Sequence, residues 1–185
     1  RPPIPALPPT DDLPVARLRH LAWRRAWRIE APGLSRVEPA GTRLLVHAEG
    51  GLAAVDARSG APRWRRPEAR PLERGDAGLA TDDEGALLGL DIRTGRVQWR
   101  VLAEDEGPFR AAWRGRDRVL AMSDATLFSL RGGRTTWRYD TCFGEIHQVA
   151  IHGPLAWMTA DDGILHALRL VDGTPRGSER AGTIV

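Results

Sequence analysis

The 185-residue sequence contains no lysine, so all 27 of its basic side chains are arginines. Without lysine there is no phosphate-binding P-loop, because that loop needs its lysine at the nucleotide phosphates. A single cysteine, Cys142, excludes an internal disulfide framework. No run of 18 or more apolar residues is present, so the sequence predicts no membrane-spanning helix. The motifs GxGxxG, GxSxG, HExxH and CxxC are also missing. The sequence therefore predicts no catalytic, cofactor-binding or metal-binding residue.

The composition is that of one globular domain. Hydrophobic residues make up 42% of the chain, enough to bury a core at this length. The formal net charge of +3 is modest, and acidic residues are interspersed with the arginines throughout. Strong binding of a polyanion is not predicted from such a balance.

A repeated unit organises the chain, and its clearest copy is Gly85 to Arg100, GALLGLDIRTGRVQWR. Its dense apolar residues predict a strand buried on both faces. The turn that follows runs from Asp91 to Gly95, because Asp bonds the backbone ahead of it and Gly tolerates positive φ. Trp99 then lies in the next strand.

Further copies of this unit occur before and after it. They are Gly51 to Trp64, Thr126 to Trp137 and Gly163 to Gly177, the last of which lacks the tryptophan. Trp27, Trp64, Trp99 and Trp137 are separated by steps of 37, 35 and 38 residues, and Gly177 lies 40 residues further on. A strand-rich period of this length is typical of propeller blades.

The pattern Gly-x-Leu-x-Ala-Leu-Asp-x-x-Thr-Gly-x-x-x-Trp, carried by residues 27 to 177, resembles the pyrroloquinoline-quinone-like β-propeller repeat family. That family includes quinoprotein dehydrogenases and non-catalytic propellers such as the outer-membrane assembly lipoprotein. The resemblance implies the fold but not the activity, because the same blade serves enzymes and binding proteins. It also implies that the repeated tryptophans, Trp64, Trp99, Trp137 and Trp27, pack between neighbouring blades.

We therefore predict an all-β fold, a small or partial propeller of about four four-stranded blades. Residues 1–14 form a Pro-rich extended arm, 15–30 a short helix followed by a closing strand, 31–180 the four repeats and 181–185 a tail. The first strand of blade two is expected near Pro71 to Glu73.

Ring closure is the main architectural question. Propellers commonly close when one terminus supplies a strand to the blade formed by the other, and so we expect Ala26 to Ile29 to pair with the last blade. Three arrangements remain open: a closed four-bladed ring, which is favoured because it exposes no apolar sheet face, a half-ring completed by a second copy, and a partial ring completed by a different subunit.

Two local clusters suggest chemistry. Asp140, Cys142, Glu145 and His147 include a thiol and an imidazole close in sequence, but a small buried cysteine and a satisfied histidine are the favoured interpretation. His147 and His152 are five apart and would face opposite sides of a strand, which disfavours joint metal ligation. The acidic segments 81–85 and 159–163 have too few spaced oxygen ligands for calcium and are interpreted as hairpin turns.

The predicted function is that of a non-catalytic protein-interaction scaffold. Candidate partner contacts are Trp23, Arg24, Arg25 and Arg28, together with the Pro-rich arm and the turn-rich rim. The resemblance implies a bacterial accessory subunit of a larger, membrane-associated assembly, in the periplasm or another extracytoplasmic compartment, without a cofactor. The alternatives are a fragment of a quinoprotein-type redox enzyme, whose site motifs are not matched, and a nucleic-acid binder that uses interleaved Trp and Arg.

Overall fold

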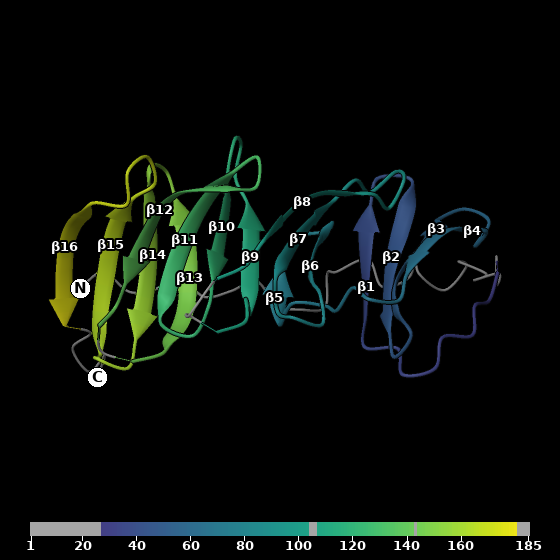
Figure 1. Ribbon diagram of the computed structural model, residues 1–185, viewed down its shortest axis with the longest axis horizontal. Coiled ribbons are helices and arrows are strands. Elements are labelled where there is room, and N and C mark those ends of the chain that lie inside the picture. Colours follow the sequence, from purple (N-terminus) through teal and green to yellow (C-terminus); the bar gives the residue numbers. More distant parts are fainter. Residues whose placement is uncertain (1–26, 104–106, 143, 181–185) are drawn as a thin grey trace, which may run out of the picture.

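The structure is a computed structural model that describes residues 27–103, 107–142 and 144–180. Within these ranges every regular element is a β-strand, and no helix has the length and hydropathy needed to cross a membrane. The strands form small sheets arranged one after another along the long axis (Figure 1). This arrangement confirms the predicted all-β architecture of about four blades. The predicted arm, short helix and tail lie outside the described residues.

Blades one and four are four-stranded antiparallel sheets whose strands follow one another in chain order. Blade one consists of β1 (Arg36–Ala40), β2 (Arg43–Ala48), β3 (Gly51–Asp56) and β4 (Pro62–Arg66). Blade four consists of β13 (Ile146–His152), β14 (Leu155–Ala160), β15 (Ile164–Arg169) and β16 (Pro175–Arg180). In each of these two blades three short turns join the four strands.

Blade two differs from the expected four strands. Its sheet contains only β6 (Leu79–Thr81), β7 (Leu87–Leu90) and β8 (Val97–Val101). The prediction of a first strand near Pro71 to Glu73 is wrong, because the chain makes one bridge, Arg70 to Thr81, and then leaves the sheet. Pro71 has no N–H with which to continue the ladder.

The departing segment joins the next blade instead. Blade three contains β9 (Ala111–Arg114), β10 (Val119–Met122), β11 (Thr126–Arg131) and β12 (Arg134–Asp140). The two-residue β5 (Arg74–Gly75) pairs with β9 in parallel, opposite Ala111 and Ala112, and so becomes a fifth strand of that sheet. This exchange ties blades two and three together by backbone hydrogen bonds as well as by packing.

The apolar core consists of three clusters, each between consecutive blades. Alternating residues of a strand point to opposite faces, so each inner blade contributes one set of side chains to the seam before it and another to the seam after it. Blade one and blade two share Leu45, Leu52, Ala54, Ala80 and Leu88. Blades two and three share a cluster around Leu87 and Phe128, and blades three and four one around Leu127 and Met158.

The described blades form an open series. Figure 1 shows β1–β4 and β13–β16 at opposite ends of the long axis, and none of the three clusters joins blade four to blade one. The favoured prediction of a closed four-bladed ring is therefore wrong for the described chain.

Tryptophan and glycine meet at the outer end of each seam. Trp64, in β4, lies over Gly95 in the β7–β8 turn of the next blade, and its Nε1 donates to the Ile92 carbonyl oxygen at 2.8 Å. Trp137 lies in the same way over Gly173 and donates to the Leu170 carbonyl oxygen at 3.0 Å. Trp99 contacts Gly133 in the shortened β11–β12 turn.

Trp27 follows the same pattern one step earlier. It lies over Gly60 in the β3–β4 turn of blade one, and its Nε1 donates to the Ala57 carbonyl oxygen at 3.2 Å. Residues 27–30 form no strand. The predicted pairing of Ala26 to Ile29 with the last blade is therefore wrong for the described residues 27–29, which lie at blade one, whereas Ala26 lies outside the described residues.

The Trp–Gly contact gives a stability prediction. A β carbon on Gly95, where φ is +71°, would lie 2.5 Å from Trp64 Cδ2. We expect Gly95→Ala to lower the free energy of unfolding by about 2–4 kcal/mol, from left-handed backbone strain plus displacement of the indole. Urea denaturation measures this change.

Gly41→Ala is the matched control, because Gly41 has a similar φ of +65° and nothing within 4 Å of the added carbon. Gly41→Ala should lower the free energy of unfolding only through left-handed backbone strain, by about 1–2 kcal/mol. Equal losses for the two variants would contradict a structural role for the Trp64 contact.

Candidate interaction surface

The residues predicted to contact a partner lie mostly outside the described chain. Trp23, Arg24 and Arg25 belong to that part of the sequence. Arg28 is described and exposed, and its Nη2 lies 3.7 Å from Glu30 Oε1. Such an exposed ion pair contributes little to stability, so the side chain is available for other contacts.

The outward face of blade one is apolar and has no described blade against it. Val37, Val46, Ala53 and Arg65 are paired across the four strands and so lie in one row on this face. Their neighbours along each strand, such as Leu45 and Leu52, point into the opposite seam with blade two. Blade one therefore has two apolar faces, and within the described residues only one of them is covered by another blade.

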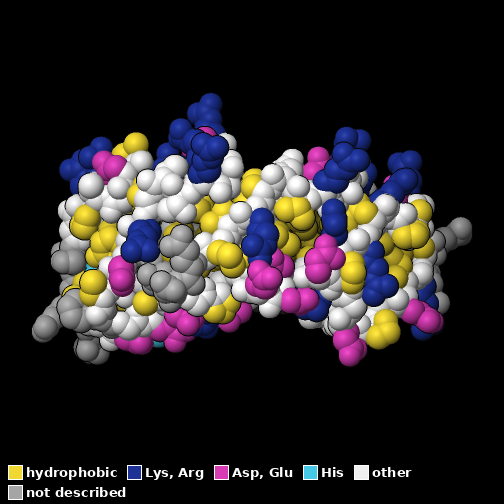
Figure 2. Space-filling view, in the orientation of Figure 1, with side chains coloured by type: hydrophobic (Ala, Val, Ile, Leu, Met, Phe, Trp, Pro, Cys, Tyr) yellow, Lys and Arg dark blue, Asp and Glu magenta, His cyan; other side chains and the backbone are white. Residues whose placement is uncertain are grey.

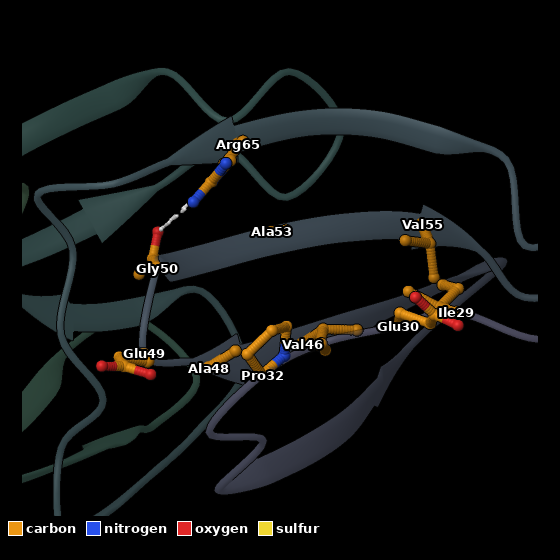
Figure 3. Close-up of a pocket in the computed structure, with 12 residues that line it drawn as sticks. Ile29, Glu30, Pro32, Val46, Ala48, Glu49, Gly50, Ala53, Val55 and Arg65 are labelled. Carbon is orange, nitrogen blue, oxygen red and sulfur yellow. Dashed lines mark hydrogen bonds between the residues drawn. The ribbon is translucent and has the colours of Figure 1, made fainter.

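A pocket of about 490 Å³ lies on this outward face. One wall is the segment from Ile29 to Pro32, and the floor is formed by β2 and β3 through Val46, Ala53 and Val55 (Figure 3). Arg65 closes the far end, where its guanidinium donates to the Gly50 carbonyl oxygen at 3.1 Å. The pocket is mainly aliphatic with charged groups at its rim, which suits an apolar protein side chain.

The outward face of blade four carries the corresponding row. Ala150, Trp157, Ala167 and Gly177 are paired across β13 to β16. Gly177 occupies the position that holds the tryptophan in the other blades, and nothing lies within 4 Å of a β carbon placed on it. Both ends of the series thus present apolar sheet faces, which in propellers are covered by a neighbouring blade.

Charge is divided between the two rims of the series. Figure 2 shows Arg side chains projecting along the upper edge and Asp and Glu side chains along the lower edge. The upper edge, here called the arginine rim, holds the hairpins β1–β2, β3–β4, β7–β8, β9–β10, β11–β12, β13–β14 and β15–β16. The lower edge, the acidic rim, holds the hairpins β2–β3, β6–β7, β10–β11 and β14–β15 with the connections between blades.

On the acidic rim the carboxylates are neutralised by arginines. Arg100 Nε lies 2.6 Å from Asp82 Oδ2, and Arg70 lies 2.9 Å from Asp83. Arg110 contacts Glu73 at 3.0 Å and also Asp124 and Glu145, and its hydrogen bond with Glu73 raises its pKa. Most of the charge on this rim is therefore used within the molecule.

On the arginine rim the balance is reversed. Aspartates there are occupied by the turns, as at Asp56, whose hydrogen bonds from Arg63 and Ser59 hold its pKa well below the ordinary value. Several exposed arginines of this rim have no hydrogen bond or ion pair from their side chains within the described part of the chain, and they include Arg58, Arg96, Arg116, Arg134 and Arg176. This rim therefore presents uncompensated positive charge.

The cluster around Cys142 does not assemble into a site. Cys142 is exposed, with φ of +60°, and its N–H donates to Asp140 Oδ1 at 2.9 Å. The prediction of a buried cysteine is wrong, because the connection between blades three and four turns its side chain outward. His147 pairs with Asp161 at 2.7 Å, and Glu145 pairs with Arg110. Among the described residues no group of acidic, His or Cys side chains could hold a metal.

One polar network in the seam between blades three and four resembles a relay of acid, imidazole and hydroxyl. His166 Nε2 lies 2.8 Å from Asp162 Oδ2, and its Nδ1 lies 3.3 Å from Tyr139 Oη. Burial raises the pKa of Tyr139, so its phenolate form is disfavoured. The network thus satisfies buried polar groups rather than activating a nucleophile.

His47 lies in the seam between blades one and two without a hydrogen bond to its ring. Its side chain is 2% exposed, and neither ring nitrogen has a hydrogen-bond partner among the described groups. Nε2 lies 3.8 Å from Glu38 Oε1. Burial, and secondly the charge of Arg36, lowers the pKa of His47 to about 4, whereas burial raises the pKa of Glu38 against the effect of Arg36.

These features define an open series of propeller blades with a tryptophan–glycine contact at each seam. Residues 16–117 match the profile of the family described as "Outer membrane protein assembly factor BamB". The match covers more than half of the chain, which therefore belongs to this family. The predicted relation to the pyrroloquinoline-quinone-like β-propeller repeat family is confirmed. No curated protein matches the sequence.

Solved structures support the same fold. The BamB structure from Moraxella catarrhalis matches with a TM-score of 0.61 at 23% identity, over 78% of this chain and 48% of that chain. The computationally designed Ika4 protein matches with a TM-score of 0.63 at 13% identity, over 80% and 99%. The C-terminal WD40 domain of Sif2 gives 0.60 at 14%, over 76% and 43%. At these identities the likeness shows the fold, and this chain spans about half the length of the BamB chain.

His47 predicts a loss of stability in acid. Its folded pKa of about 4 lies below the ordinary 6.5, so the unfolded chain takes up a proton between these values and the folded chain does not. The free energy of unfolding should fall as the pH drops from 6.5 to 4, by up to about 3 kcal/mol. The raised pKa of Glu38 partly offsets this fall.

Urea titrations at several pH values measure the effect. His47→Leu should flatten the pH dependence, while His152→Gln, at an exposed histidine, should leave it unchanged. An identical pH dependence in wild type and His47→Leu would show that His47 is not the group responsible.

Proposed function

We propose that this chain is a non-catalytic protein-binding scaffold and an accessory subunit of a larger, membrane-associated assembly outside the cytoplasm. The observation that carries the proposal is membership in the family whose description names outer membrane protein assembly. Propeller blades are rigid supports, and their turns and exposed faces contact other proteins readily.

The end faces are the surfaces where we expect protein partners. Each is an apolar sheet face of the kind that the internal seams cover with a neighbouring blade. The pocket on blade one adds a recess for an anchoring side chain. A protein that supplies further blade-like sheets, a second copy included, fits such a face by shape and by polarity.

The mass of the full chain, isolated gently from its source, tests the proposal. We expect it to sediment with other proteins, well above its own 20.3 kDa, and mass spectrometry of the same fraction should identify membrane-associated companions. Recovery alone at 20.3 kDa would contradict the scaffold role. Recovery at twice that mass without another protein would show that copies complete each other and would contradict the accessory-subunit role.

Substitutions locate the contact. Val37 is an exposed residue of β1 on the blade-one end face, and Val37→Arg puts a charge there. The variant should release the companions, because a partner that covered this face would bury an unpaired charge at a cost of several kcal/mol. Val97→Arg, at a similarly exposed valine of blade two outside both end faces, is the matched control and should retain them. If both variants retained the companion proteins, the blade-one end face would not be part of the interface.

A further inference from the structure

A second pocket, of about 380 Å³, lies on the arginine rim between blades three and four. It is enclosed by the β9–β10 loop and by the hairpins β13–β14 and β15–β16. Its walls combine charged and aliphatic side chains, and the three arginines outnumber the one carboxylate: Arg118, Arg169, Arg176, Asp117, Pro154, Leu155, Leu170 and Val171. A recess with both kinds of group can hold a carboxylate and an adjoining apolar side chain at once.

The three arginines of this rim pocket differ in their freedom. Arg118 is fixed by Asp117, 3.3 Å away, and donates to the Leu170 carbonyl oxygen. Arg169 contacts Asp172 at 3.3 Å through one nitrogen, Nη1, which leaves its other donors available. Arg176 is exposed and has no ion pair or hydrogen bond within the described residues. Arg176 is therefore the group best placed to bind an incoming carboxylate in a two-pronged manner.

The apolar wall is equally open. Val171 is 61% exposed at the tip of the β15–β16 hairpin, and Pro154 is exposed beside it in the β13–β14 turn. An aliphatic side chain lying on these residues would bury surface that the fold leaves in water. Arg116 lies in the same β9–β10 loop as Arg118 and adds positive charge near the pocket, while the acidic rim on the opposite edge is neutralised by its own ion pairs.

We propose that the rim pocket binds an extended acidic segment of a protein partner, with a Glu or Asp carboxylate on Arg176 and a neighbouring aliphatic residue on Val171. This inference rests on the proposed function as a protein-binding scaffold. Charge complementarity selects an acidic partner, and the recess favours a peptide over a membrane, because headgroups in a flat surface would meet the projecting arginines without entering the pocket.

Fluorescence anisotropy with a labelled twelve-residue peptide of alternating Glu and Leu tests the proposal on the full chain. Arg176→Gln should weaken binding about tenfold, the effect of losing roughly 1.4 kcal/mol of charge-assisted hydrogen bonding. Arg176→Lys should recover only part of the loss, because lysine keeps the charge but lacks the planar guanidinium that donates two parallel hydrogen bonds to a carboxylate. The matched control Arg96→Gln, which removes the same charge from the same rim, should change binding less than twofold.

Three results would overturn the proposal. Equal weakening by Arg176→Gln and Arg96→Gln would mean that the rim attracts acidic peptides through diffuse charge without a pocket. Binding to anionic phospholipid vesicles that depends on Arg176, with no binding of the peptide, would assign the rim to a membrane surface. A Gln–Leu peptide should bind at least tenfold more weakly than the Glu–Leu peptide, and similar binding of the two would remove the role of the carboxylate.

Failure of this proposal is distinguishable from failure of the proposed function. Companions that remain with Arg176→Gln but are released by Val37→Arg would leave the scaffold role intact and show that the rim pocket is not its contact. Isolation of the wild-type chain without companions would contradict the scaffold role, whatever the peptide does.

Discussion

The contact on which this fold depends is the indole of one blade lying over the backbone of a turn in the next. It combines apolar burial with one hydrogen bond to a carbonyl group, and it is made at Gly60, Gly95 and Gly173 in nearly the same way. Each sheet buries its apolar side chains in clusters shared with the neighbouring blades. Stability therefore comes from the seams, and blades one and four each lack one seam in the described chain.

Much of the architecture is local enough to be predicted from sequence. The Asp-x-x-Thr-Gly turn of Asp91 to Gly95 and the spacing of the tryptophans mark the blades. Both signals are local, because Asp and Gly shape the turn in which they lie. The position of Trp27 could also have been predicted, since Trp64 precedes its glycine by 31 residues and Trp27 precedes Gly60 by 33. The pairing of β5 with blade three and the uncovered outer faces of blades one and four could not be predicted, because they depend on how the blades are placed relative to one another.

The interaction surfaces were less visible in the sequence than the blades. From a net charge of +3 and interspersed acidic residues, the sequence predicted no strong binding of a polyanion and gave no sign of a charged rim. In an antiparallel sheet, successive turns lie at opposite ends of the strands. This alternation in the folded chain brings Arg116 and Arg134 to one rim and Asp82 and Asp124 to the other. The exposure of Cys142 was missed for a related reason, because a connection between blades has no period that predicts which way its side chains turn.

End faces and rim differ in the physics of the contacts they can make. An apolar sheet face binds through area removed from water, which salt affects little, whereas the arginine rim acts through charge, which salt screens over about 8–10 Å at physiological strength. The rim can therefore speed the encounter with an acidic partner, and the end faces can hold a partner once it has arrived. Because Val37 and Arg176 lie on different blades at opposite ends of the series (Figure 1), a partner that used both would have to extend along the whole row of blades.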